Sequence, residues 1–505
     1  MIRNQRKAGA VLSYVGIGIN NILGIVFTPF LLRMLGQSEF GLYSLVGSVV
    51  AYLTVMDFGF GNAIVRYTAK YRALGKIDEQ YSLYGMFLMI FSVIGVLAFI
   101  VGMGIYFNVD NLFDKSMSPT ELDKARIMML LLILNLVLTF PLSVFGSIIN
   151  AHENFVFQKL VNISRILIYP CIMIPLLIHG NKAITVVVVT TILNISTLLM
   201  HFWFCLAKLK IKIYFHNFEW GLLREISGFS FFIFLNYIVE RVYLSSGQFV
   251  IGIIAGTTAV AIYSIAILFQ QYYIGFSSAI SNVFLPKITT MVTNNVPDKE
   301  VSDLFIKTGR VQFIIMSFIM SGFILFGKAF INLWAGSGYK DSYIIALIIM
   351  IPLTFPLIQS IGITILQAKN QQKFSSLLLI AVAILSLGIS IPLARLYGGI
   401  GFAIGTSFAY IAGNIIILNI YYYKKININI PQFWTEISRM AIPVIIITAI
   451  DFYVNTLIFD NQVKGMIYKL ILFLAVYFPI VYKFGINQYE KNLIISVVNK
   501  FRLKK

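Results

Sequence analysis

The stretch Leu35-Gly-Gln-Ser-Glu-Phe-Gly-Leu-Tyr-Ser44 has a counterpart in the second half of the chain, Ala255-Gly-Thr-Thr-Ala-Val-Ala-Ile-Tyr-Ser264. A glycine, a hydroxyl residue two positions on and a Tyr-Ser pair keep the same spacing in both. Two more matches follow in the same order: Thr139-Phe-Pro-Leu142 recurs as Thr354-Phe-Pro-Leu357, and Pro175 recurs as Pro392. The offsets of the three matches are nearly equal, which predicts two halves built on one plan; the alternative is a chance similarity of Ile- and Leu-rich sequence.

The amino-acid composition argues against a water-soluble multidomain enzyme. Of the 505 residues, 59% are hydrophobic and 12% are charged, whereas an average soluble protein is about a quarter charged and at most half apolar. Apolar runs of about 20 residues, the length that crosses a bilayer, fill most of the chain. The run 128–138 lacks the alternation that β-barrel strands show. We therefore expect an all-α integral membrane protein.

These apolar runs predict about 14 transmembrane helices. Each run holds about 20 residues and is bounded by polar or turn residues. The expected spans are residues 9–32, 40–63, 82–107, 126–148, 155–178, 184–206, 228–254, 260–284, 311–333, 343–366, 375–395, 399–422, 440–458 and 465–483.

The net charge of +19, from 39 Lys and Arg against 20 Asp and Glu, mostly reports orientation in the membrane. With 14 spans and both termini cytoplasmic, 27 of the 39 basic residues fall in cytoplasmic segments and ten in outside segments. This excess obeys the positive-inside rule. A nucleic-acid binder would instead gather its basic residues on one solvated face. We expect a multi-pass protein with both termini cytoplasmic and no nucleic-acid partner.

The repeat divides the expected spans into two lobes of six helices in the same orientation. We predict an N-terminal lobe over residues 1–207, a cytoplasmic linker over 208–226, a C-terminal lobe over 227–424, and two extra helices with a basic cytoplasmic tail over 425–505. Parallel repeats of this kind are related by an axis along the membrane normal, and the substrate site lies where the repeats meet near the midplane. The pattern is typical of transporters.

Several motifs resemble those of a known family. They are Arg33-Met-Leu-Gly-Gln-Ser-Glu-Phe-Gly-Leu-Tyr43, Asp57-Phe-Gly59 with Arg66, residues 256–264, Gln367-Ala-Lys-Asn370 and Tyr397-Gly-Gly-Ile-Gly-Phe-Ala403. Over about the first 420 residues the chain resembles the polysaccharide-transporter branch of the multidrug/oligosaccharidyl-lipid/polysaccharide exporter superfamily.

This resemblance implies a two-lobed, alternating-access flippase of the bacterial cytoplasmic (inner) membrane. Its substrate would be an undecaprenyl-diphosphate-linked oligosaccharide repeat unit, moved outward for O-antigen, capsule or other surface polysaccharide assembly. The implied partners are this lipid-linked oligosaccharide and membrane lipid, together with the polysaccharide polymerase and glycosyltransferases of the same assembly route.

Polar residues inside the spans are candidates for a substrate cavity, because a polar group in hydrocarbon is expensive unless it faces water or a partner. Arginine suits a diphosphate, since its fork binds phosphate oxygens bidentately and it stays charged. Tyrosines suit sugar faces and hydroxyls. We place the cavity along spans 1, 2, 7 and 8, and its candidate residues are Arg66, Arg165, Arg241, Asn20, Asn21, Tyr52, Asn236, Tyr243, Gln270 and Tyr273.

Each candidate charge also has a structural interpretation. Glu240 and Arg241 are about 100° apart on a helix and can be satisfied by separate neighbours. Arg66 can be an anchor at the cytoplasmic end of its span. Arg165 can pair with Asp57 or Glu240.

The coupling of transport to an ion is a separate expectation. Many members of the family that the chain resembles carry an acidic residue before an Ile-Gly pair near the end of span 7, where this chain has Gln248-Phe-Val-Ile-Gly252. This departure leaves Glu240 and Asp57 as the candidate groups for a coupling proton or sodium ion. Asp57 points away from Arg66 on an ideal helix, but a bend at Gly59 and Gly61 would change that.

Catalytic signatures are missing from the sequence. It contains no phosphate-binding loop, zinc-type His pair or nucleophile motif, and Cys171 and Cys205 both lie in apolar runs. We expect no enzyme activity, no metal and no resident cofactor. The alternatives are a flippase for a lipid-linked peptidoglycan precursor, a multidrug exporter of the same superfamily, and a membrane glycosyltransferase or polymerase.

Overall fold

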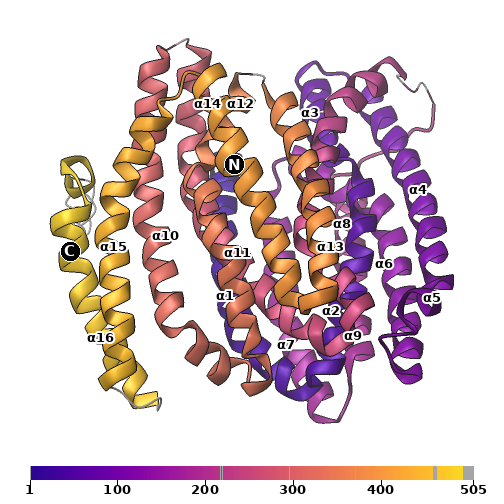
Figure 1. Cartoon of the computed structure of the whole chain (residues 1–505). Helices are drawn as coiled ribbons and strands as arrows, with labels where there is room; N and C mark the ends of the chain where they lie inside the picture. The colour runs from indigo at the N-terminus through magenta and orange to yellow at the C-terminus, as the bar shows by residue number, and fades with distance from the viewer. Residues whose placement is uncertain are drawn as a thin grey trace. The chain divides into compact units, whose positions relative to one another are not determined.

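The structure is a computed structural model that describes residues 2–216, 218, 220–294, 296–369, 371–458 and 463–492. These residues are almost entirely helical and form no strand (Figure 1). The predicted all-α class is thus confirmed. The helices are α1 (Ile2–Leu35), α2 (Gln37–Leu53), α3 (Phe60–Ala73), α4 (Ile77–Phe107), α5 (Val109–Phe113), α6 (Pro119–Ala151), α7 (Phe155–Ile178), α8 (Ala183–Ala207), α9 (Trp220–Thr293), α10 (Asp298–Trp334), α11 (Asp341–Ile358), α12 (Ser360–Ala368), α13 (Gln372–Tyr410), α14 (Leu418–Lys425), α15 (Ile430–Ile458) and α16 (Val463–Ile480).

Within the described ranges, 12 helical segments are long and apolar enough to cross a membrane, so the count of 14 is not confirmed. Two of these segments, Tyr237–Ser281 and Lys373–Lys425, are 45 and 53 residues long and each covers two expected spans. They contain the non-helical residues Gly256 (φ 77°) and Gly398 (φ 58°). Positive φ values are accessible to glycine because it has no Cβ.

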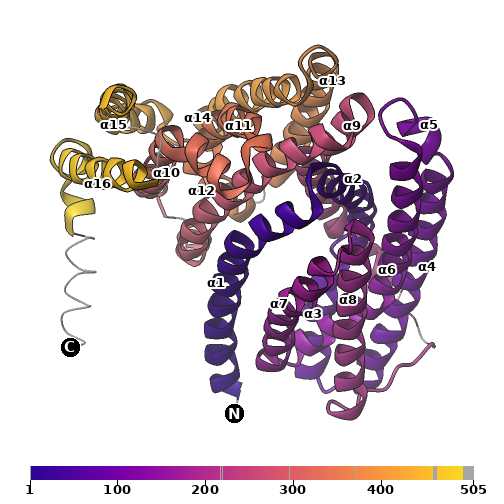
Figure 2. The ribbon, with the colours of Figure 1, turned by 90° about the horizontal axis from the view of Figure 1, so that it is seen from below.

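The chain forms two compact units, Met1–Ser264 with Ala394–Gly399 and Ile265–Leu393 with Ile400–Lys505. In the first unit α4 packs on α6, α6 on α8, and α1 on α7 (Figures 1 and 2). Its core includes the fully buried Leu42, Phe87 and Ile148. Figure 2 shows α1 curving along its length, and Pro29 lies inside this helix, where a missing N–H donor favours a bend.

In the second unit α10 packs against α11 and α15, and α16 packs against α15. Aromatic side chains of α16 also pack against α10: Phe473 stacks on Phe318 of α10 with 5.7 Å between ring centroids. The predicted division into six-helix lobes stays a prediction.

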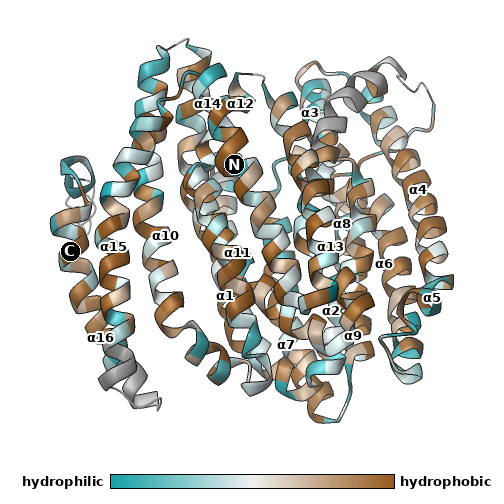
Figure 3. Cartoon of the chain, in the orientation of Figure 1, coloured by the Kyte–Doolittle hydropathy of each residue, from teal (hydrophilic) through white to brown (hydrophobic). Residues whose placement is uncertain are grey.

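Apolar side chains cover the outer faces of the helices as well as their contacts. Ile100 and Ile384 are 60% and 67% exposed, and hydrophobic residues run along the long helices while hydrophilic ones gather toward helix ends and turns (Figure 3). Large exposed aliphatic surfaces of this extent suit a lipid environment. The chain is therefore a multi-pass membrane protein.

Candidate functional site

The second expected span is broken in the middle of its apolar sequence. After α2 a single 3₁₀ turn runs from Thr54 to Asp57, and the chain then passes through two left-handed residues, Phe58 (φ 52°) and Gly59 (φ 70°), before α3 begins. Non-helical backbone at membrane depth is tolerated where protein or a water-filled cavity surrounds it. The bend expected at Gly59 and Gly61 is thus a complete interruption of the helix, and Asp57 lies within this interruption.

The break belongs to the first repeat alone. At the equivalent positions of the second repeat, 274–279, the chain is continuous helix within α9. Discontinuous membrane helices are a recurring way of building substrate and ion sites in transporters. This asymmetry between otherwise related helices marks the break as the candidate functional site.

Residues of α9 lie against the break within the first unit. The Phe58 ring stacks on Phe234 with 4.5 Å between centroids. The Tyr237 hydroxyl lies within electrostatic range of Asp57, and also of Glu240 and Arg241 farther along α9. Three of the charges predicted from spans 2 and 7 therefore lie in the same region of the first unit.

Arg241 and Asp57 are charged residues that form no ion pair within the described ranges. Both side chains are half-buried, and within the described ranges neither is bonded to a residue of opposite charge. Glu240 is exposed. Among the described residues, these charges therefore have no ion-pair partner.

Tyr52 lies near the end of α2, just before the break. Its hydroxyl is 2.5 Å from the Ser246 hydroxyl of α9, and its ring meets Phe249 edge-on at 6.5 Å. Tyr243 is half-buried on the same stretch of α9. These contacts hold α9 beside α2 next to the break.

The remaining candidates of the first unit lie apart from this cluster. Arg66 is exposed on α3, with its guanidinium 5.6 Å from the Tyr67 ring centroid. Asn20 and Asn21 are exposed on α1. The side chain of Asn236 is outside the described residues. No observation places a ligand at any of them, so their roles stay predictions.

Arg165 of α7 belongs to a polar network whose other members lie on α6 and α8. Its Nη1 donates to Asn194 of α8 at 3.1 Å. Asn194 in turn donates to Asn135 and Thr139 of α6, both at 2.9 Å. The structure thus gives Arg165 an amide partner instead of Asp57 or Glu240. Asn135 and Asn194 are intramembrane polar residues, a signal that could have found them from sequence.

Gln270 and Tyr273 are buried in the second unit, each with about 1% of its surface exposed. The Tyr273 hydroxyl is 2.8 Å from the Thr354 hydroxyl and donates to the Met316 carbonyl at 3.3 Å. In this arrangement the polar face of span 8 packs against α10 and α11. The predicted contact of these two residues with substrate stays a prediction.

The second unit also contains an apolar groove of about 860 Å³ between α10, α11 and α15. Its lining includes Met320, Ile351, Phe355, Trp434 and Phe452. Few polar side chains reach it, Ser317, Ser321, Thr354, Ser438 and Thr448 among them. The groove suits a hydrocarbon chain.

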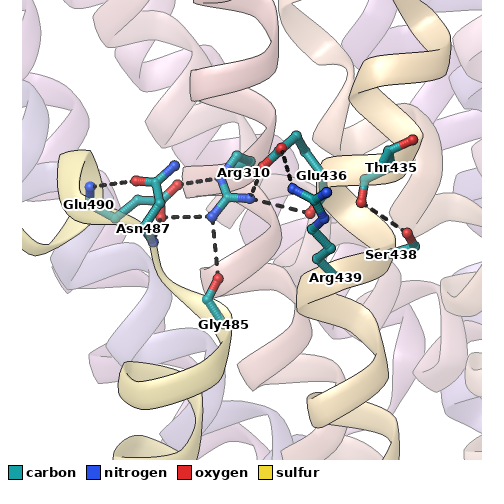
Figure 4. Close-up of polar contacts among 8 residues, drawn as sticks. All are labelled: Arg310, Thr435, Glu436, Ser438, Arg439, Gly485, Asn487 and Glu490. Carbon is teal, nitrogen blue, oxygen red and sulfur yellow. Dashed lines mark hydrogen bonds and ion pairs between the residues drawn. The ribbon is translucent and has the colours of Figure 1, made fainter.

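Arg310 of α10 forms the most complete ion-pair cluster in the described part of the chain (Figure 4). It is 4% exposed, and all its donors are used: Nε and Nη2 bond Glu490 at 2.6 and 2.9 Å, Nη1 bonds the Glu436 carboxylate and carbonyl, and Nη2 also bonds the Gly485 carbonyl. A guanidinium has five N–H donors. Arg310 therefore ties α10 to α15 and the segment after α16.

The comparison with family models decides the family. Residues 7–292 match the model described as polysaccharide biosynthesis protein. The chain belongs to this polysaccharide biosynthesis protein family. Membership confirms the resemblance that the motifs around Gly36, Asp57 and Gly256 indicated.

The chain has two curated relatives that are described as putative O-antigen transporters. It is 25% identical over 402 residues to a putative O-antigen transporter of Escherichia coli, covering 77% of this chain and 89% of that protein. It is 23% identical over 421 residues to a putative O-antigen transporter of Shigella flexneri, covering 82% and 96%. These relatives are not enzymes, in agreement with the lack of catalytic signatures in the sequence.

Solved structures show the fold of this family member. The chain is similar to the lipid II flippase MurJ in an inward closed conformation, with a TM-score of 0.72, 18% identity, and coverage of 96% of this chain and 100% of that one. It is also similar to an inward-facing multidrug resistance MATE family transporter, with a TM-score of 0.63, 13% identity, and coverage of 82% and 98%. The predicted transporter fold is confirmed.

Proposed function

We propose that this protein is a flippase that moves undecaprenyl-diphosphate-linked oligosaccharide repeat units from the inner to the outer leaflet of the bacterial cytoplasmic membrane, for O-antigen, capsule or other surface polysaccharide assembly. The observation that carries the proposal is the match over most of the chain to two putative O-antigen transporters. Both termini are cytoplasmic in this proposal, as the distribution of basic residues predicts.

The diphosphate is the part of such a substrate that needs a specific charge. Arg241 supports this role because it is half-buried beside the helix break and is bonded to no carboxylate in the described ranges. Its forked donors match phosphate oxygens bidentately. Arg66 on α3 is exposed and offers a second cation, on the span that contains the break. Tyr52 on α2 and Tyr243 on α9 lie near the break and suit sugar hydroxyls.

The prenyl chain needs an apolar surface while the headgroup crosses. The groove between α10, α11 and α15 supplies one, since its volume of about 860 Å³ lies among aliphatic and aromatic side chains. Burying each CH₂ of a lipid chain is worth about 0.8 kcal/mol. One of the two helices added after the repeat, α15, thus gains a role, because it forms one wall of the groove.

Transport of a charged headgroup needs an energy source. Asp57 supports coupling to a proton or sodium ion because its carboxylate lies on the break and accepts no hydrogen bond from a described residue. Glu240 lies within range of the same tyrosine and is the second candidate. Glycosyltransferases would supply the lipid-linked unit and a polymerase would consume it.

Complementation tests the proposed function. The gene is expressed in a bacterium that lacks its own O-antigen flippase and in a second strain depleted of its lipid II flippase. The proposal expects restored surface polysaccharide and no accumulation of lipid-linked repeat units in the first strain. Rescue of the second strain alone would replace the proposal with a peptidoglycan-precursor flippase, which shares the diphosphate and the prenyl chain.

A further inference from the structure

Glu121, at the start of α6, accepts hydrogen bonds from two segments that the sequence repeat relates to each other. Its Oε1 accepts from Ser38 Oγ at 2.5 Å and from Thr257 Oγ1 at 2.7 Å. Its Oε2 accepts from the Ser118 amide and hydroxyl, both at 2.9 Å. All four bonds lie within the first compact unit.

Ser38 and Thr257 stand in equivalent turns. Ser38 is two residues after Gly36, and Thr257 directly follows Gly256. The two glycines share one unusual backbone conformation, and a helix follows each of them. The Glu121 carboxylate therefore joins the beginning of α2 to its counterpart in the second repeat.

Backbone atoms of the two turns also approach closely. A Cβ added to Gly41 of α2 would collide with the Thr257 carbonyl oxygen, and one added to Gly256 would lie 2.5 Å from the Ser116 carbonyl oxygen. Ser116 Oγ donates to the Gly252 carbonyl at 2.8 Å. A Cβ therefore fits at neither Gly41 nor Gly256, and the backbones of these segments lie in direct contact.

The contacts on the first-repeat side are more numerous than those on the second. Glu39 pairs with Lys124 and accepts from the Ala183 amide at 3.1 Å, and Lys182 donates to the Met34 carbonyl at 3.0 Å. The turn at Gly36 is thus fixed to α6 and α8 independently of Glu121. If the two turns separated, the bonds to Thr257 and Gly252 would break, whereas the bonds of Glu39 and Lys182 would stay intact.

In repeat-built transporters, access to the site alternates as one repeat rocks against the other. From these contacts we infer that Glu121 with Ser116 is a latch that joins the beginning of α2 at Gly36 to the turn within α9 at Gly256, and that Thr257 and Gly252 leave it once per transport cycle. The inference rests on the proposed function as a flippase. The distribution of basic residues assigns the latch to the outer side of the membrane.

Cross-linking tests whether the latch must open. In a chain with Cys171 and Cys205 replaced by Ala, Ser38→Cys and Thr257→Cys place two sulfurs where the hydroxyl oxygens are 3.4 Å apart. Oxidation should abolish polysaccharide export, and reduction should restore it. Full export with the disulfide formed would overturn the inference.

The matched control is Ser390→Cys with Thr406→Cys, where the same two atom types are also 3.4 Å apart within α13. Both residues belong to the second repeat, so this disulfide should leave export unchanged. Loss of export in both pairs would show that cross-linking itself is harmful and would remove the support for a latch.

A distance measurement needs no substrate and separates this inference from the proposed function. Spin labels at Gln37→Cys and Thr258→Cys should report a short and a long distance in the purified protein. Thr257→Val removes a bond to a charged acceptor and should shift the ratio toward the long distance by about tenfold or more, whereas Ser118→Ala, on the first-repeat side, should not. If every variant gives only the short distance, the inference of a latch is overturned, whatever the substrate is. If both distances are found but no polysaccharide is exported, the result counts only against the proposed function as a flippase.

Discussion

Gly36 and Gly256, which hold equivalent places in the two repeats, have nearly the same backbone conformation, with φ/ψ of 79°/173° and 77°/−174°. This region of φ/ψ is almost restricted to glycine. The sequence repeat is therefore a repeat of structure, since a second matched pair follows: Gly180 and Gly398, close after Pro175 and Pro392, both have positive φ.

Replacing Gly256 by Ala should destabilise the protein more than replacing Gly36. Both substitutions force a side chain into this conformation, at about 1–3 kcal/mol. The Gly256 Cβ would also meet the Ser116 carbonyl, whereas nothing lies within 4 Å at Gly36. The midpoint of thermal unfolding in detergent should fall most for Gly256→Ala. Gly275→Ala, in open space within a helix, is the control and should not lower it.

Removing Glu490 should weaken the attachment of the C-terminal segment. Glu490 is 2% exposed and bonds Arg310 through both oxygens. Loss of one partner of a buried ion pair costs about 3–5 kcal/mol. Glu490→Gln should therefore lower the unfolding midpoint, while Glu300→Gln, at an exposed position on α10, should leave it unchanged. Equal midpoints for both variants would mean that the cluster of Figure 4 does not support the fold.

Reversing the charge of Arg241 should stop export without lowering the protein level. Arg241→Glu would repel the diphosphate, and Arg241→Lys would keep the charge but lose the bidentate fork, with an intermediate loss. Surface polysaccharide is compared at equal amounts of membrane-inserted protein, with Arg395→Glu, at an exposed position, as the control. Normal polysaccharide with Arg241→Glu would remove this residue from the site.

Asp57→Asn should uncouple transport from its driving ion. The amide keeps the size of the side chain and cannot exchange a proton or balance a sodium ion. In vesicles with an imposed ion gradient, export by the variant should no longer respond to the gradient, and Asp78→Asn, exposed on α4, should respond normally. If Glu240→Gln alone removes the response, the coupling group is Glu240 instead.

Periodicity and repeats predict the elements of this fold well. Apolar runs identified the helices, and the nearly equal offsets between the two halves identified the turns at Gly36 and Gly256. The count of spans was harder to predict because apolar sequence continues through Gly256 and Gly398, where the backbone turns sharply within one long segment. A glycine in an apolar run does not say by itself whether the helix bends or ends there.

Partners of polar side chains could not be predicted in the same way. The polar face of span 8 is present in the sequence, but its pattern is the same whether it faces water or, as for Tyr273, a Thr354 hydroxyl on another helix. Arg165 and Arg310 find partners far along the chain, in Asn194 and Glu490. Helical periodicity defines which residues share a face, and only the packing of helices defines what that face meets.

The most direct test of the flippase account measures which leaflet holds the sugar. The purified protein is reconstituted into vesicles that contain undecaprenyl-diphosphate-linked oligosaccharide in both leaflets, and a membrane-impermeant periodate reagent oxidises the exposed sugars. With the wild-type protein the whole pool should become oxidised, whereas with Arg241→Glu only the outer-leaflet share should react. Oxidation limited to the outer leaflet in both samples would contradict the account.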